Sequence, residues 1–99
     1  MADRTGVTRT VWLLEHYEPG APAPLLRQRI QAMAATASSK ARPAVRLIAG
    51  AVLPKDEEAL CLLEATSAHA IRAVCRESRF RVDRLTRVEP VLHPHTEDI

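Results

Sequence analysis

The pattern of apolar and polar positions predicts four β-strands. Each predicted strand is a short run rich in apolar and β-branched side chains, bounded by proline, glycine or charged residues. The runs are residues 11–17, 45–53, 59–65 and 85–92. A charged segment, residues 54–58, joins the second run to the third and predicts a β-hairpin.

Apolar residues at helical spacing predict two α-helices between the strands. The first lies over residues 24–40, where Pro24 fits the first helical turn because no backbone N–H is needed there. The second lies over residues 67–79, with Ser67 as its N-cap. The apolar stripes are Leu26, Ile30, Met33 and Ala37 in the first helix and Ala68, Ile71, Val74, Cys75 and Ser78 in the second.

The order of these elements predicts the fold. Strand, helix, strand, strand, helix, strand is the ferredoxin-like βαββαβ arrangement of the α+β class. Its four-stranded antiparallel sheet has the strand order four-one-three-two, with both helices on one face. A chain of 99 residues fits a single domain, residues 1–99, with an ordered core over about residues 9–94 and a mobile tail over residues 95–99.

Period-two alternation sorts the strand side chains onto two faces of the sheet. The face under the helices is predicted to hold Trp12, Leu14, His16, Cys61, Leu63, Ala65, Thr86, Val88, Pro90 and Leu92. The opposite face is predicted to hold Leu13, Glu15, Tyr17, Ala49, Ala51, Leu53, Leu60, Leu62, Glu64, Leu85, Arg87, Glu89 and Val91. Because no helix covers this second face in the fold, its apolar side chains predict a homodimer of stacked sheets, the dimeric α/β-barrel type.

Composition narrows the classes of partner. A net charge of +2 and a content of one Trp, one Tyr and one Phe make nucleic acid an unlikely partner. No apolar run is long enough for a membrane span and no secretory signal is present, so we expect a cytoplasmic protein. Cys61 and Cys75 form no CxxC pair and are expected to be reduced and buried.

One basic cluster has more than one interpretation. It consists of Arg72, Arg76, Arg79, Arg81, Arg84 and Arg87. The cluster can bind an anionic ligand or nucleic acid. Little aromatic interleaving and nearby acidic residues favour a solvated helix face instead.

Polar residues on the uncovered face mark a candidate ligand pocket. Its members are Glu15, Tyr17, Ala51, Glu64 and Arg87. A hollow beside the small Ala51, with charged groups at its mouth, suits a hydrophobic or amphipathic small molecule. A plain ion pair between Glu15 and Arg87 is the simpler interpretation of those two residues. An enzyme interpretation, a cofactor-free monooxygenase or isomerase, would use Glu15, Tyr17 and Glu64.

A metal site is a further candidate. Alternation places His16 and Cys61 on the same face, and both side chains offer metal ligands. A hydrogen-bonded histidine at a strand end is the simpler interpretation of His16. His93 and His95 lie close together in the sequence, but a solvated tail explains them better.

Several short motifs resemble the bacterial nickel-binding-protein-like family, a small domain of unknown function. They are Leu14-Glu15-His16 with Pro19-Gly20, Cys61-Leu62-Leu63-Glu64-Ala65-Thr66-Ser67, Ala70-Ile71-Arg72, Phe80, Asp83-Arg84-Leu85, Val88 and Pro94. The resemblance implies a ferredoxin-like fold, a dimeric α/β barrel and nickel as a ligand held between stacked sheets. This chain has Ala51, Leu53 and Val74 where the family often carries histidine or tyrosine, so we predict no tight nickel site.

Overall fold

The computed structural model describes residues 8–91 and confirms the predicted order of elements. The elements are β1 (Thr10–Tyr17), α1 (Ala23–Ser38), β2 (Val45–Leu53), the 3₁₀ turn η1 (Pro54–Asp56), β3 (Glu58–Ala65), α2 (Ala68–Ser78) and β4 (Arg84–Val88). All strand pairs are antiparallel and the sheet order is β2-β3-β1-β4, which is the predicted order. The chain therefore has a ferredoxin-like α+β fold.

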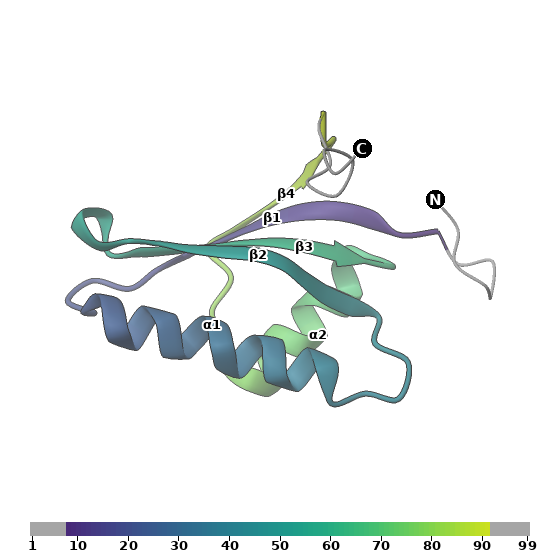
Figure 1. Ribbon diagram of the computed structural model, residues 1–99, viewed down its shortest axis with the longest axis horizontal. Coiled ribbons are helices and arrows are strands. Elements are labelled where there is room, and N and C mark those ends of the chain that lie inside the picture. Colours follow the sequence, from purple (N-terminus) through teal and green to yellow (C-terminus); the bar gives the residue numbers. More distant parts are fainter. Residues whose placement is uncertain (1–7, 92–99) are drawn as a thin grey trace, which may run out of the picture.

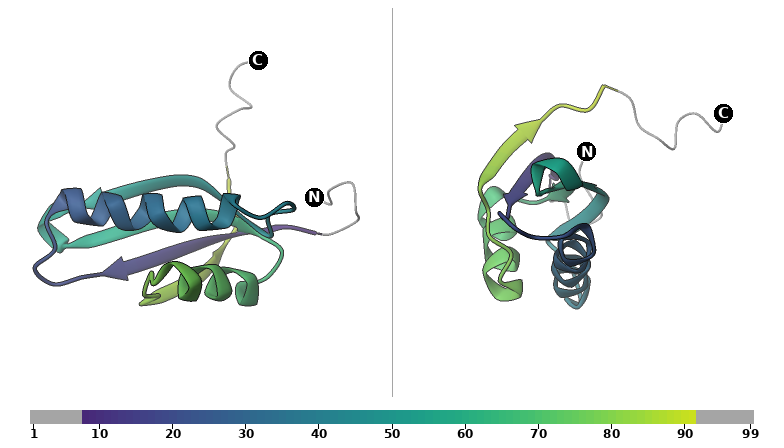
Figure 2. Two further views of the ribbon diagram at one scale, coloured as in Figure 1. Left: turned by 90° about the horizontal axis from the view of Figure 1, so that it is seen from below. Right: turned by 90° about the vertical axis from the view of Figure 1, so that its left-hand side faces the viewer.

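Both helices lie on the same side of the sheet (Figure 1). The buried core consists mainly of side chains from the helices and from the sheet face that they cover. Viewed from the helix side, α1 and α2 cover different parts of the sheet (Figure 2). The largest fully buried side chains are Leu14, Leu26, Met33, Leu63, Ile71, Val45, Cys61 and Cys75. In the described residues the other face of the sheet carries no helix, as predicted.

The helix boundaries follow from the local sequence. Pro22 is the N-cap of α1 and has an extended backbone. The hydroxyl of Ser67 accepts a hydrogen bond from the amide of Ala70 at 3.1 Å, which confirms Ser67 as the N-cap of α2. After α2, Arg79 adopts a left-handed conformation with φ of 59°, so the chain turns back toward the sheet.

A β-bulge at Ile48 in β2 moves the later residues of the strand to the opposite face. Leu47 pairs with Leu63, whereas Ala49 pairs with Leu62, so Ile48 is an extra residue on this strand. Strict alternation would put Val45 and Ala49 on one face. The bulge instead leaves Ala49 on the uncovered face, where the face assignment above predicts it.

Gly50 then lies under α1. A Cβ atom at this position would lie 3.2 Å from Cγ2 of Ile30, tighter than an ordinary packing contact. Glycine therefore allows the helix to approach the edge of the sheet closely.

The face assignment predicted for β4 is wrong. Leu85 pairs with the buried Leu14, and Arg87 pairs with Trp12, so both lie on the helix side. Thr86 and Val88 consequently lie on the uncovered face. Both parities of this strand mix apolar and polar residues, so alternation alone cannot fix its register.

The predicted end of β4 is also too late. The strand ends at Val88 rather than at residue 92. Pro90 has no N–H to give to a strand ladder, which accounts for the early end. Leu92, the tail over residues 95–99 and the two tail histidines lie outside the described residues.

Candidate functional site

The uncovered face of the sheet is organised in rows of directly paired residues. One row runs across all four strands as Ala51, Leu60, Glu15 and Arg84. The Glu15 carboxylate lies 3.7 Å from Nε of Arg84. The sequence predicted an ion pair between Glu15 and Arg87, but Arg87 lies on the other face and Arg84 takes its place.

The next row outward contains a second carboxylate. Tyr17 pairs with Glu58, and Glu58 pairs with Leu53. Burial raises the pKa of Glu58, and a hydrogen bond with Glu15 raises it further. Glu58, which faces Glu15 from the adjacent strand, therefore favours its protonated form more than a free glutamate does, and it lies beside Tyr17, a residue that is 47% exposed.

Sequence reasoning missed Glu58. Glu58 is the last residue of the acidic run and the first residue of β3, whereas the sequence pattern places it in the charged connection, residues 54–58. The available signal was its parity, because Glu58, Leu60, Leu62 and Glu64 alternate along one face of the strand.

Glu64 lies at the opposite end of the same face. It pairs with Val11 and with Arg46, and an oxygen of its carboxylate lies 3.9 Å from Nη1 of Arg46. Four residues separate Glu64 from Leu60 on β3, a distance of roughly 13 Å along a strand. Glu64 is thus on the predicted face, but it is not grouped with Glu15 and Tyr17.

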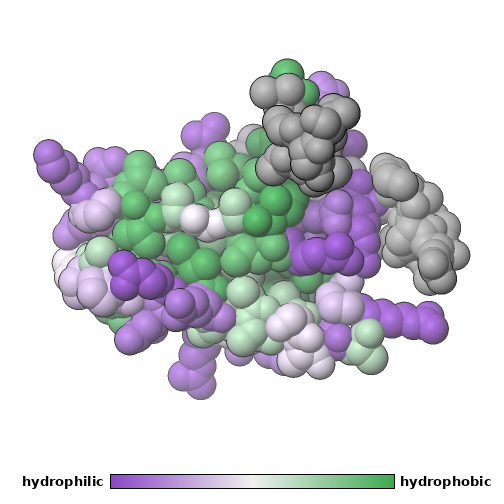
Figure 3. Space-filling model, in the orientation of Figure 1, coloured by the Kyte–Doolittle hydropathy of each residue, from purple (hydrophilic) through white to green (hydrophobic). Residues whose placement is uncertain are grey.

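Apolar side chains occupy the middle of the uncovered face, between its two polar ends. Leu62 pairs with Leu13 and Ala49, and all three side chains are at least partly exposed. In the space-filling view, apolar residues gather around β2 and above it, on the side of the sheet away from the helices (Figure 3). Hydrophilic residues gather toward both ends of the molecule in the same view. The face therefore presents an apolar centre flanked by charged groups.

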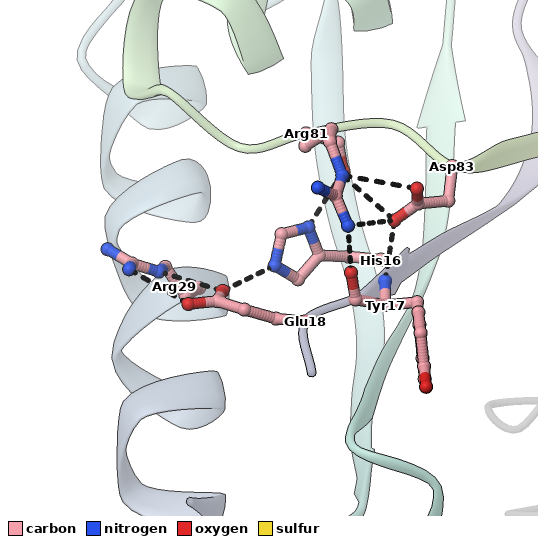
Figure 4. A network of polar contacts seen from close by, with 6 residues as sticks. All are labelled: His16, Tyr17, Glu18, Arg29, Arg81 and Asp83. Carbon is pink, nitrogen blue, oxygen red and sulfur yellow. Dashed lines mark hydrogen bonds and ion pairs between the residues drawn. The ribbon is translucent and has the colours of Figure 1, made fainter. Parts of the chain in front are cut away.

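On the helix side, His16 is buried and both of its ring nitrogens have partners. Nδ1 lies 2.8 Å from the carbonyl oxygen of Arg81, and Nε2 lies 2.8 Å from the Glu18 carboxylate. Glu18 also accepts hydrogen bonds from Arg29 of α1. These bonds, with Arg29 as the larger contributor and His16 next, lower the pKa of Glu18 to about 2 (Figure 4).

A second set of contacts holds the loop before β4 to the end of β1. The Tyr17 amide donates to the Asp83 carboxylate at 2.6 Å, and Arg81 donates to the Tyr17 carbonyl oxygen (Figure 4). Burial opposes ionisation of Asp83, but the Tyr17 amide and Arg81 outweigh it and lower its pKa. His16 and Asp83 thus fasten two loops at the end of the sheet where Glu15 and Tyr17 lie.

His16 and Cys61 share the helix-covered face, as alternation predicts. Leu14 pairs with Cys61 and His16 pairs with Ala59, so the two candidate ligands are diagonal neighbours. Burial raises the pKa of the Cys61 thiol to about 12. Within residues 8–91 no group of three or more His, Cys, Asp or Glu side chains is arranged to hold a metal ion. His16 shows the hydrogen-bonded arrangement of the simpler interpretation.

Two grooves run between α1 and β2. A groove of 430 Å³ lies between the end of α1 and the start of β2, and one of 390 Å³ lies between the middle of both elements. Ala51 lines the second groove together with Ile30 and Gly50. Ala51 is therefore at the outer edge of the uncovered face.

Comparisons with known proteins bear on the fold. No family model matches the sequence, and no curated protein matches it. The structure is similar to the crystal structure of SCO4226 from Streptomyces coelicolor A3(2), with a TM-score of 0.69 and 22% sequence identity. The match covers 83% of this chain and 99% of that one. This likeness supports the ferredoxin-like fold.

The helices of residues 8–91 do not include a membrane-spanning one: neither α1 nor α2 combines the necessary length with sufficient apolar character.

Proposed function

We propose that the protein is a homodimeric cytoplasmic binding protein that holds a small amphipathic molecule between two stacked sheets. The observation that carries the proposal is the apolar centre of the uncovered sheet face. Leu13 and Leu62 are partly exposed there, and Ala49, which pairs with Leu62, is exposed. Contiguous exposed apolar surface of this kind usually marks an interface. A second copy of the chain offers the same surface and satisfies two-fold symmetry.

The polar end of this face supports the ligand chemistry. Glu15, Tyr17, Glu58 and Arg84 supply carboxylates, a hydroxyl and a guanidinium within two adjacent rows. The apolar centre begins one row further in. An amphipathic molecule would place its polar group among these four residues and its apolar part against Leu60 and Leu13.

A second candidate function is a cofactor-free enzyme of the monooxygenase or isomerase type. The raised pKa of Glu58 beside Glu15 favours this function, because a carboxyl group with a pKa closer to neutral pH is better suited to give or take a proton as a general acid or base. Tyr17 can donate a hydrogen bond to a substrate oxygen. In this candidate function Glu58 takes the role that the sequence pattern gives to Glu64, because Glu64 lies at the other end of the face.

Nickel, which the family resemblance implies, is expected to be weakly bound or absent from this protein. Ala51, Leu53 and Val74 offer no metal ligands. His16 already has a partner at each ring nitrogen.

Native mass spectrometry of the protein purified from its cells tests the proposal. We expect a dimer carrying an organic molecule of low mass, and Ala51→Trp should retain the dimer but lose that molecule. Ala35→Trp, on the exposed side of α1, is the matched control and should retain both. A monomer, or a dimer that carries only nickel, would contradict the proposal.

A further inference from the structure

A groove on the outer side of α2 lies apart from the uncovered sheet face. It has a volume of 260 Å³ and is lined by Arg72, Cys75, Arg76, Phe80 and Val82. Phe80 is almost fully buried and Cys75 is buried beside it, so the floor is apolar. Arg72 and Arg76 are exposed and lie one helical turn apart, so their guanidinium groups flank the same groove.

The positive charge of this groove is not neutralised within residues 8–91. Arg72 and Arg76 form no ion pair there, whereas the neighbouring acidic residues have partners. Glu77 pairs with Lys40 of α1, and Asp83 pairs with Arg81. Two like charges at this helical spacing disfavour the helix. Arg72 and Arg76 are exposed, so they are not part of the core, and they lie apart from the uncovered sheet face.

More positive charge lies at the same edge of the molecule. Arg87 is on the helix side of β4, opposite Trp12. β4 begins alongside α2 when the molecule is viewed from the helix side (Figure 2). The sequence pattern favours a solvated helix face here; the structure adds a groove with an apolar floor, and its guanidinium groups form no ion pair within the described part of the chain.

We propose that this groove binds a small phosphate monoester, with Arg72 and Arg76 on the phosphate group and the organic part against Phe80 and Val82. Guanidinium groups match phosphate oxygens with paired hydrogen bonds. A phosphate monoester carries a charge of about −1.5 to −2 near neutral pH, which matches two arginines better than a carboxylate does. The volume suits a small organic group rather than a folded partner.

Phenyl phosphate is a suitable probe, followed by amide chemical shifts in ¹⁵N-labelled protein. We expect saturable binding with a Kd below about 1 mM and the largest shifts in α2 and around Phe80. Inorganic phosphate should bind more weakly because it lacks the apolar part. Phenol should not bind measurably because it lacks the charge.

Three matched variants separate this site from general charge effects. Arg72→Gln and Arg76→Gln should each weaken phenyl phosphate binding about tenfold or more, the loss expected for a charge-assisted hydrogen bond. Arg42→Gln, an exposed arginine between α1 and β2, should leave the affinity unchanged. The amide spectra of the free variants report whether each one is folded. Absence of saturable binding, equal loss in Arg42→Gln, or equal affinity for inorganic phosphate would overturn the proposal.

Discussion

At the scale of single residues, His16 illustrates how hydrogen-bond chemistry assigns a role. A backbone carbonyl and a carboxylate can only accept hydrogen bonds, and they are the partners of its two ring nitrogens. Both bonds form together when the ring carries a proton on each nitrogen. The ring also lies 4.6 Å from the ring of Phe80, centroid to centroid. These contacts give His16 a structural role that joins the end of β1 to the loop before β4.

Glu18, which bonds to His16 and Arg29, should make stability depend on acidic pH. Its pKa is about 2 in the folded protein against an ordinary value of 4.5. Because the folded-state pKa is lowered, the contribution is complete above pH 4.5 and is lost as the pH falls toward 2. The unfolding free energy of Glu18→Gln should therefore decrease less between pH 4.5 and pH 2 than that of the natural sequence. Urea denaturation at each pH measures this. Identical pH profiles for the two proteins would contradict this assignment.

Glu58 should act in the opposite direction. The pKa of Glu58 is raised in the folded protein, so folding disfavours the ionised form. The free energy of unfolding should therefore decrease through Glu58 as the pH rises above the ordinary pKa of 4.5. Glu58→Gln should be more stable than the natural sequence at pH 7, and the difference should shrink in acid. Thermal unfolding at several pH values measures this. The stability difference between Glu58→Gln and the natural sequence could instead favour the variant less at pH 7 than in acid. That result would show that Glu58 is not held near Glu15 in this way.

At the scale of elements, the Ser67 cap is the clearest local contribution to stability. Ser67→Ala removes the acceptor for the Ala70 amide and should lower the free energy of unfolding by about 1 kcal/mol. The change is measured by chemical denaturation. Ser38→Ala, at an exposed position in the last turn of α1, is the control: it removes a hydroxyl that donates to the Ala35 carbonyl oxygen rather than a cap acceptor, and it should change stability by less than about 0.5 kcal/mol. Equal effects from the two changes would contradict a specific capping role.

The elements also show what the sequence could predict. Helix spacing, the Ser67 cap and the order of strands follow from local chemistry, and the structure confirms them. The register of β4 does not follow from local chemistry, because it depends on how the loop through Arg81 and Asp83 attaches to β1. That attachment joins residues far apart in the sequence.

The sequence predicted only part of the candidate site, because local patterns do not report which distant residues come together. Alternation placed Glu15, Tyr17, Ala51 and Glu64 on the uncovered face, and the pairing confirms that placement. Alternation does not report distance along a strand, so it grouped Glu64 with residues at the other end. The alternation of apolar and polar residues does not predict the bulge at Ile48 either, because an extra residue in one strand does not change the sequence pattern in a recognisable way.

At the scale of the whole molecule, one layer of helices leaves one face of the sheet uncovered within residues 8–91. The two ends of that surface carry the Glu15–Arg84 and Arg46–Glu64 ion pairs, and its centre is apolar. In the proposed dimer the charged ends would limit how two sheets can stack, and the apolar centre would supply the favourable burial. The proposed function therefore requires that two copies associate through this face.

Sedimentation equilibrium tests that association most directly. We expect a mass about twice the 10.9 kDa of the chain at micromolar concentration. Leu62→Lys, which places a charge at the centre of the face, should shift the protein toward monomer. Arg76→Glu, on the outer side of α2, should leave the dimer intact. A natural sequence that sediments as a monomer at micromolar concentration, or a Leu62→Lys variant as dimeric as the natural sequence, would contradict a dimer formed through this face.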